Sequence, residues 1–270
     1  TEIDLYRNRS LNYTNLFDTE IGFMRGKNKD GSWAKTFSPD KWGDAFTEGS
    51  SWHWTWCVFH DPIGLAESFG GIEKMRYRLD EVFTTAPTFD YSYYGQQIHE
   101  ITEMLVSDMG QYAHGNQPIQ HAIYLYNWLE QPWKTQMYAR EIMDKLYSSA
   151  PDGLCGDEDN GQTSAWYVFS AIGFYPVTPG TGQYAIGSPL FKNIKLHLQN
   201  GNSFEIKAPN NSNKNVYISA IKKNDSNYAK NYINYDDIMN GSIFSVEMSS
   251  EPNLNLGVGD SSKPYSASQD

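Results

Sequence analysis

The stretch LCGDEDNGQTSAWYVFSAIGFYPV, residues 154–177, places three consecutive acidic residues directly before an apolar, aromatic segment typical of a buried helix. Carboxylates at a helix N-terminus bind free N–H groups and complement the helix dipole, so capping is the simplest interpretation. A cap needs only one carboxylate, however, and three neighbouring ones repel each other. The flanking glycines would let a ligand approach the backbone closely. The sequence therefore leaves capping and ligand binding open for Asp157, Glu158 and Asp159.

Length and charge exclude several classes of protein. The chain has 270 residues, 39% of them hydrophobic and 15% aromatic, which suffices for one large or two smaller cores. The formal net charge of −11 comes with no stripe of Lys and Arg, so a nucleic-acid partner is not expected. No apolar run reaches the roughly 18 residues of a membrane-spanning helix, so no membrane span is expected. An uncharged partner fits this composition better.

The two cysteines carry little information about function. Cys57 and Cys155 lie 98 positions apart and form no CxxC pair, which excludes the common zinc and redox motifs. We expect two thiols, with a single disulfide as the alternative.

Apolar spacing predicts helices over most of the chain. Residues 98–109 and 119–129 carry apolar side chains three to four positions apart. A third helix is predicted after Gln131, with Pro132 in its first turn and a stop at SSAPDG. The short connections favour antiparallel helical hairpins. The apolar positions are Ile98, Ile101, Leu105, Met109, Ile119, Ile123, Tyr126 and Leu129.

The pattern changes from a helical period to a period of two after about Tyr184. Residues 193–208 predict a hairpin around Asn200 and Gly201, a dipeptide suited to positive φ angles. We therefore expect a mainly α protein with a C-terminal β part: helices over residues 1–183, a small antiparallel sheet over 184–256 and a flexible tail over 257–270.

A second acidic position lies far upstream, in FTEGSSWHWTW, residues 46–56. Glu48 precedes Trp52, Trp54 and Trp56, and a buried hairpin or helix edge would explain these residues. They also fit a carboxylic acid in an aromatic pocket, where desolvation would raise its pKa and prepare it to donate a proton. Two carboxylate stations, one with aromatic walls and one polar, match the acid and base of glycoside hydrolysis.

Two further motifs are weaker by themselves. In QQIHEITEM, His99 and Glu103 share a helix face, but Glu103 stands where a zinc protease motif needs its second histidine. In YAHGNQPIQH, residues 112–121, polar side chains surround a Gly-Asn-Gln-Pro turn before a helix.

These motifs, in this order, resemble glycoside hydrolase family 92, the calcium-dependent exo-acting α-mannosidases. The similarity covers nearly the whole chain up to Ala208, and the DEDNGQTSAWYVFSAIGFYP block is its most specific part. The resemblance implies a partial (α/α)6 barrel, an inverting mechanism, Glu48 as general acid, and Asp159 as general base assisted by Asp157. Inversion needs room for a water, so these carboxyl groups are expected about 6.5 to 9.5 Å apart.

The resemblance also implies ligands. Ca²⁺ would engage mannose hydroxyls, with Asn116 and Gln117 as its candidate ligands, although many members carry Glu where Gln117 stands. His99 and Glu100 match the pair that contacts the leaving sugar and accompanies α-1,2 linkages. Trp54 and Trp56 are the remaining candidates for substrate binding. The expected substrate is a terminal α-mannoside of an N-glycan or mannan, hydrolysed outside a bacterial cell by a secreted or surface-attached enzyme.

The resemblance begins inside the barrel, so we expect a fragment whose partner is the missing N-terminal part of the same enzyme. A non-catalytic glycan-binding or structural fragment is the main alternative. A phosphorylase needs only one protein carboxylate, and the pair Asp157 and Asp159 argues against it. A mannosyl-phosphate hydrolase can dispense with the acid, but Glu48 is present.

Overall fold

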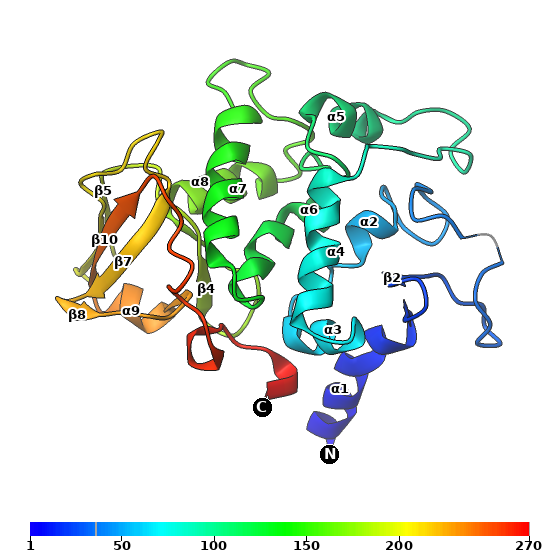
Figure 1. Cartoon of the computed structure of the whole chain (residues 1–270), viewed down its shortest axis with the longest axis horizontal. Coiled ribbons are helices and arrows are strands. Elements are labelled where there is room, and N and C mark those ends of the chain that lie inside the picture. The colour runs from blue at the N-terminus through cyan, green and yellow to red at the C-terminus, as the bar shows by residue number, and fades with distance from the viewer. Residues whose placement is uncertain (36, 270) are drawn as a thin grey trace. The chain divides into compact units, whose positions relative to one another are not determined.

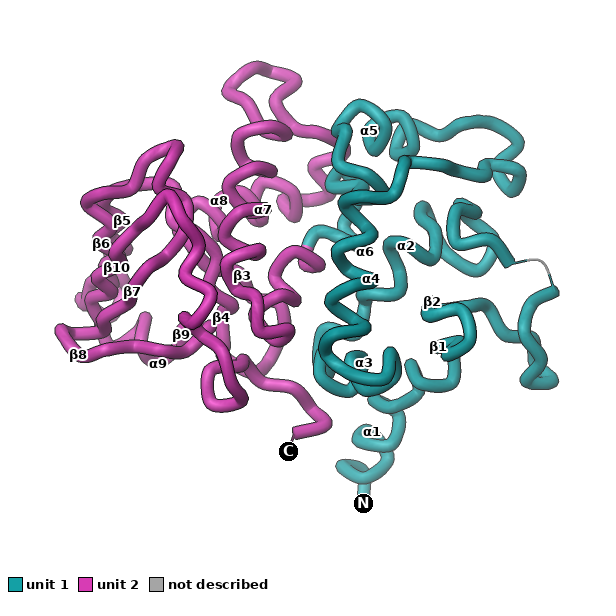
Figure 2. The backbone as a smooth tube through the Cα atoms, in the orientation of Figure 1, with its two compact units in different colours: residues 1–120 teal, residues 121–270 magenta. Residues whose placement is uncertain are grey.

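The computed structural model describes residues 1–35 and 37–269, which divide into two compact units (Figure 2). Unit 1 contains residues 1–120 and unit 2 contains residues 121–270. This division falls after residue 120, whereas the sequence predicted a boundary near residue 183. Two helices, α7 (Pro132–Lys145) and α8 (Gln162–Ile172), belong to the same unit as the strands. Helix α7 contacts β7 (Tyr217–Lys223), and α8 contacts β3 (Phe174–Tyr175).

Unit 1 is built from short helices and long connections (Figure 1). The predicted helix at residues 98–109 is confirmed as α5, whose buried side chains include Ile101 and Met104. The predicted helix at 119–129 is instead the short α6 followed, in unit 2, by a 3-10 helix. The helices of unit 1 are α1 (Glu2–Ser10), η1 (Leu11–Asn15), α2 (Ser51–Trp54), α3 (Pro62–Ser68), α4 (Ile72–Thr84), α5 (His99–Ser107) and α6 (Gln117–Gln120), and its strands are β1 (Phe17–Asp18) and β2 (Phe23–Met24).

Unit 2 opens with helices that pack on its strands (Figure 1). The 3-10 helix η2 (Ala122–Asn127) leads into α7 (Pro132–Lys145), which has Pro at its first turn as predicted. Helix α8 (Gln162–Ile172) ends at Gly173, whose φ of 112° suits a glycine C-cap. The described residues do not by themselves show the partial (α/α)6 barrel that the resemblance implies, so it stays an expectation.

Two sheets follow, and one of them is mixed. The three-stranded sheet β3-β4-β9 is antiparallel and begins at Phe174, ten positions before the predicted start. The five-stranded sheet has the order β5-β6-β10-β7-β8, and β10 pairs parallel to β6. The strands are β3 (Phe174–Tyr175), β4 (Gln183–Ile186), β5 (Asn193–His197), β6 (Ser203–Lys207), β7 (Tyr217–Lys223), β8 (Ser226–Asn227), β9 (Tyr232–Asn234) and β10 (Ile243–Ser249), with α9 (Tyr235–Met239) before the last.

The predicted hairpin is confirmed as β5 and β6, with a difference in its turn. Gly201 has a φ of 88°, but Asn200 is not among the described residues with positive φ. The Gly201 N–H donates to the Leu198 oxygen at 3.0 Å, and the Leu198 N–H donates to the Asn202 oxygen at 2.9 Å. One left-handed residue therefore closes this turn, as in a hairpin with a glycine bulge.

Helix α7 is fastened to the sheet region by two buried polar side chains. Gln136 accepts the Ile218 N–H at 2.9 Å, and Arg140 donates to the Pro189 oxygen at 3.0 Å and to Asn211 Oδ1 at 2.8 Å. Burial lowers the pKa of Arg140. The strands of unit 2 enclose a core that includes Phe174, Phe204 and Phe244.

The segment predicted to be a flexible tail is packed against unit 2. Trp128 Nε1 donates to the Tyr265 oxygen at 2.9 Å, and Lys263, only 3% exposed, pairs with Glu130 and Asp260 at 3.1 and 2.8 Å. The short η3 (Asp260–Ser262) and η4 (Ala267–Gln269) lie in this segment. The contacts with Trp128 and Glu130 join segments that are remote in sequence, so they leave no period in the local sequence. Asp270 lies outside the described residues.

Candidate active site

Glu48 lies in a tight loop that leads into α2. The loop is closed at its base, because the Gly43 N–H donates to the Gly49 oxygen at 3.0 Å. Glu48 has a φ of 47°, a left-handed conformation that is uncommon for residues other than glycine, asparagine and aspartate. Its side chain is exposed, and its carboxylate has no hydrogen-bond partner among the described residues. The loop thus presents a carboxyl group outward from unit 1.

The three tryptophans after Glu48 do not form the predicted aromatic pocket. Trp52 is 5% exposed, and its Nε1 donates to Asp40 at 2.8 Å. Trp56 is fully buried and stacks on Phe69 with ring centroids 5.8 Å apart. Both rings belong to the core, so Trp56 lies where a sugar cannot reach it. Trp54 is half-buried and remains beside the loop.

The predicted cluster on α5 is formed. His99 Nδ1 lies 2.8 Å from Glu103 Oε1, and His99 Nε2 lies 3.5 Å from Glu100 Oε1. Glu100 is 12% exposed, and its Oε2 finds no partner among the described residues. A buried acceptor without a donor is costly, so this oxygen is suited to receive a hydroxyl group.

Asn116 and Gln117 are adjacent to the Glu48 loop. Asn116 is 8% exposed, and its Nδ2 donates to the Glu48 main-chain oxygen at 2.5 Å while its Oδ1 accepts the Gln117 N–H at 3.0 Å. Gln117 Nε2 is buried without a partner among the described residues. The structure therefore brings Glu48 together with both predicted calcium ligands.

These two amides fit a calcium ion as part of its shell. Calcium takes six to eight oxygen ligands, and amide oxygens are among them. The Asn116 oxygen keeps a second lone pair, and rotation of the Gln117 amide would place its oxygen where Nε2 has no partner. In the described part of the chain, no three His, Cys, Asp or Glu side chains gather as a metal site. The remaining oxygens would come from water, substrate or other parts of the polypeptide.

In unit 2, the three neighbouring carboxylates divide their roles. Glu158 caps α8: its Oε2 accepts the Gly161 N–H, and its Oε1 accepts the Ser164 N–H at 3.2 Å. Hydrogen bonding, first of all from Ser164, lowers the pKa of Glu158. The capping interpretation therefore holds for one residue of the three.

Asp157 and Asp159 are exposed on either side of this cap. Asp159 has a φ of 48° and opens a run of three left-handed residues that continues through Asn160 and Gly161. Its carboxylate has no hydrogen-bond partner among the described residues. Asp, Asn and Gly adopt this conformation more readily than other residues, so the run suits its sequence. Helix α8 thus begins from a loop that leaves Asp157 and Asp159 exposed.

Comparison with known proteins decides the family. The family model described as "Glycosyl hydrolase family 92 catalytic domain" matches residues 1–250. The chain belongs to glycosyl hydrolase family 92. Among solved structures, it is similar to the family 92 inverting mannosidase BT2199 of Bacteroides thetaiotaomicron, with 53% identity and a TM-score of 0.87 over 98% of this chain and 36% of that one.

Two other relatives extend the comparison. The α-mannosidase BT3965 of the same organism, solved with mannoimidazole, is 39% identical, with a TM-score of 0.86 over 96% of this chain and 34% of that one. An uncharacterized secreted glycosidase of Arthroderma benhamiae is 23% identical over 98% of this chain and 34% of its own length. The chain thus spans about a third of the length of these relatives.

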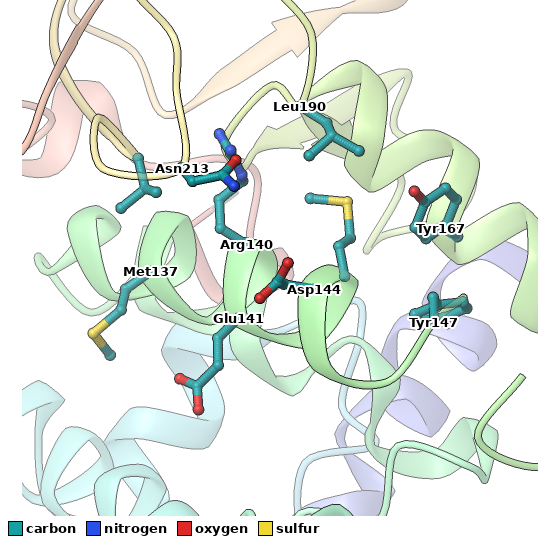
Figure 3. Close-up of a pocket in the computed structure, with 10 residues that line it drawn as sticks. Met137, Arg140, Glu141, Asp144, Tyr147, Tyr167, Leu190 and Asn213 are labelled. Atoms are coloured by element: carbon teal, nitrogen blue, oxygen red, sulfur yellow. The ribbon is translucent and has the colours of Figure 1, made fainter. Parts of the chain in front are cut away.

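Unit 2 also contains a cavity that none of the predicted site residues lines. Its volume is about 470 Å³, and Figure 3 shows Arg140, Glu141 and Asp144 projecting from α7 beside it. Tyr147 and Tyr167 lie together at one end of it. Tyr167 belongs to the DEDNGQTSAWYVFSAIGFYP block, whereas Asp157 and Asp159 do not line this cavity.

Cys57 is partly buried and His53 is buried, both within unit 1. Burial raises the pKa of the Cys57 thiol to about 12, and both cysteines are thiols rather than a disulfide. His53 is buried, its Nδ1 accepting the Ser50 N–H at 2.9 Å and its Nε2 lying 3.0 Å from the Gln111 oxygen. The sequence did not identify His53 and Tyr94 as supports of the Glu48 loop. His53 lies within the FTEGSSWHWTW motif, but its contacts with Ser50 and Gln111 are not visible in the sequence pattern. Tyr94 lies outside the quoted motifs, and its hydroxyl accepts the Glu48 N–H.

His53 is expected to make the protein sensitive to acid. Burial lowers the pKa of His53 to about 4, whereas an unfolded histidine titrates near 6.5. Between these values the unfolded chain binds the extra proton, so the free energy of unfolding falls as the pH falls from about 6.5 to about 4. His53→Gln should reduce the slope of the unfolding free energy against pH by an amount that corresponds to up to one bound proton. The exposed His197→Gln is the control and should leave the slope unchanged. Denaturant unfolding across this range measures the slope, and an unchanged slope would contradict the assignment.

Proposed function

We propose that this chain carries the catalytic groups of an exo-acting α-mannosidase that hydrolyses terminal α-mannosides with inversion. The supporting observation is its 53% identity to an inverting mannosidase over 98% of the chain. Glu48 and Asp159 both lie in loops and have positive φ angles, and both are exposed. This exposure fits a reaction in which each carboxyl group must contact the substrate or a water. The relatives are about three times as long as this chain. We therefore assign the proposed activity to a longer enzyme of which this chain is a part.

In the proposed reaction, Glu48 protonates the oxygen of the departing sugar while Asp159, assisted by Asp157, removes a proton from the attacking water. Water approaches the face of the sugar opposite to the leaving group, so the released mannose has the β configuration. The expected separation of the two carboxyl groups is about 6.5 to 9.5 Å.

We further propose an α-1,2 preference and secretion or attachment to the cell surface. His99 and Glu100 would receive the leaving sugar, since Glu100 holds a buried oxygen that a sugar hydroxyl could satisfy. Secretion is supported by a fungal relative described as a secreted glycosidase. No helix among the described residues is long and apolar enough to cross a membrane.

The direct test is NMR of the first product released from α-1,2-mannobiose by the full-length enzyme. β-Mannose should appear before mutarotation produces the α anomer. Initial release of α-mannose would contradict an inverting mechanism. Binding without turnover would instead support the non-catalytic glycan-binding alternative.

We expect calcium, rather than zinc, to support this activity. When bound, calcium would polarise the sugar hydroxyls, and Asn116 and Gln117 would contribute amide oxygens to hold it. EGTA should therefore abolish hydrolysis, and added Ca²⁺ should restore it where Zn²⁺ does not. Full activity in the chelator after dialysis would show that calcium is dispensable.

A further inference from the structure

Side chains bind the main chain of Glu48 on both sides. Its N–H donates to the Tyr94 hydroxyl oxygen at 3.1 Å, and its carbonyl oxygen accepts Asn116 Nδ2 at 2.5 Å. The carbonyl oxygen of Thr47 accepts Trp54 Nε1 at 2.9 Å. Three side chains therefore converge on two consecutive residues of the loop.

These side chains come from separate parts of unit 1. Tyr94 lies 46 positions after Glu48. It is part of a turn in which the Tyr94 N–H donates to the Tyr91 oxygen at 3.0 Å. Asn116 lies 68 positions after Glu48, directly before α6, and Trp54 ends α2. Local sequence preference cannot produce such convergence, so tertiary packing builds it.

The need of the Glu48 main chain for hydrogen-bond partners does not by itself explain why Tyr94 and Asn116 bind it. Glu48 is exposed, and water could bind its N–H and its carbonyl oxygen equally well. Fixed partners differ from water because they select one backbone conformation. The selected conformation is the left-handed one at φ 47°, which an unrestrained glutamate rarely adopts.

Gly43 allows the turn that contains Tyr93 and Tyr94 to pack against the Glu48 loop. A Cβ atom at Gly43 would clash with the ring of Tyr93 and lie 2.9 Å from Tyr94 Cε2. Gly43 also has a φ of 84° and donates its N–H to Gly49. The absence of a side chain at this position allows the Tyr94 ring to approach the base of the Glu48 loop.

We propose that Tyr94, Asn116 and Trp54 are positioning residues that hold the Glu48 backbone and so direct its carboxyl group at the departing sugar oxygen. This inference rests on the proposed function, in which Glu48 is the general acid. A misdirected acid would transfer its proton less efficiently, which matters only where the leaving group needs a proton.

Tyr94→Phe tests the inference because it keeps the ring and removes only the hydroxyl. In the full-length enzyme, kcat/KM for α-1,2-mannobiose should fall about tenfold, mainly through kcat, as expected for a lost positioning hydrogen bond. An aryl α-mannoside with an activated leaving group should lose less than about twofold, because it needs little protonation. Tyr93→Phe is the matched control and should change neither substrate, with Tm measured for both variants.

The same two substrates, tested with Glu48→Gln, separate the possible failures. If Glu48→Gln shows no dependence on the leaving group, the assignment of the acid fails. If Glu48→Gln is selective but Tyr94→Phe loses nothing, or loses equally on both substrates, the positioning role alone is overturned. The double variant should show no further loss on mannobiose beyond Glu48→Gln, because a positioning residue acts only through the group it positions.

Discussion

Replacing Glu48 with Gln is expected to lower kcat/KM for α-1,2-mannobiose by about 10² to 10⁴, the usual contribution of a general acid. An alkoxide of mannose is a poor leaving group and must be protonated as it departs. An activated aryl mannoside leaves without this help, so its hydrolysis by Glu48→Gln should be largely retained. Gln keeps the shape of Glu, and the main-chain bonds of residue 48 to Tyr94 and Asn116 do not depend on the carboxyl group.

The comparison of two leaving groups makes this prediction specific. A variant that merely unfolds or binds sugar poorly would lose both substrates together. Equal losses on the mannobiose and the aryl mannoside would therefore remove Glu48 from the role of acid. The pH profile offers a second measurement, because the alkaline limb assigned to the acid should disappear for the aryl substrate in Glu48→Gln.

Asp159→Asn is expected to lose both substrates by about 10² to 10⁴, since every turnover of an inverting enzyme needs an activated water. Asn tolerates the left-handed conformation that Asp159 adopts at φ 48°, so the loop should keep its shape. The measurement is kcat/KM on the same two substrates. A selective loss on mannobiose alone would assign Asp159 to leaving-group protonation instead.

Glu158→Gln is the matched control for Asp159→Asn. Glu158 accepts the N–H groups of Gly161 and Ser164, so its replacement weakens the cap of α8 and should lower Tm. Its activity on both substrates should stay within a few-fold of the unchanged enzyme. A loss as large as that of Asp159→Asn would show that the loop geometry, rather than the Asp159 carboxylate, carries the effect.

Much of the local structure could be predicted from the sequence. The apolar spacing of residues 98–109 gave the helix that is α5, and Pro132 marked the first turn of α7. Period-two alternation predicted the pair β5 and β6. These features depend on contacts between residues that are close in sequence, where the geometry of a helix or a strand imposes a period.

The tertiary structure decided which contacts each of the similar residues within a motif makes. Three adjacent carboxylates look alike in sequence, but the Glu158 carboxylate is the one that accepts the Gly161 and Ser164 N–H groups at the start of α8. Three tryptophans follow Glu48, yet Trp52 and Trp56 pack in the core while Trp54 binds the loop. The parallel pairing of β6 with β10 and the docking of residues 260–266 on unit 2 likewise depend on segments remote in sequence.

The sequence by itself determined that this chain carries the acidic and aromatic motifs of family 92 on helices followed by strands. Tertiary packing alone decided that the backbone of Glu48 is held by Tyr94 and Asn116, 46 and 68 positions away. The physical reason is that a helix or a strand repeats its contacts along the chain and leaves a periodic trace in sequence. A single hydrogen bond between two distant loops repeats nothing, so it exists only once the chain has folded.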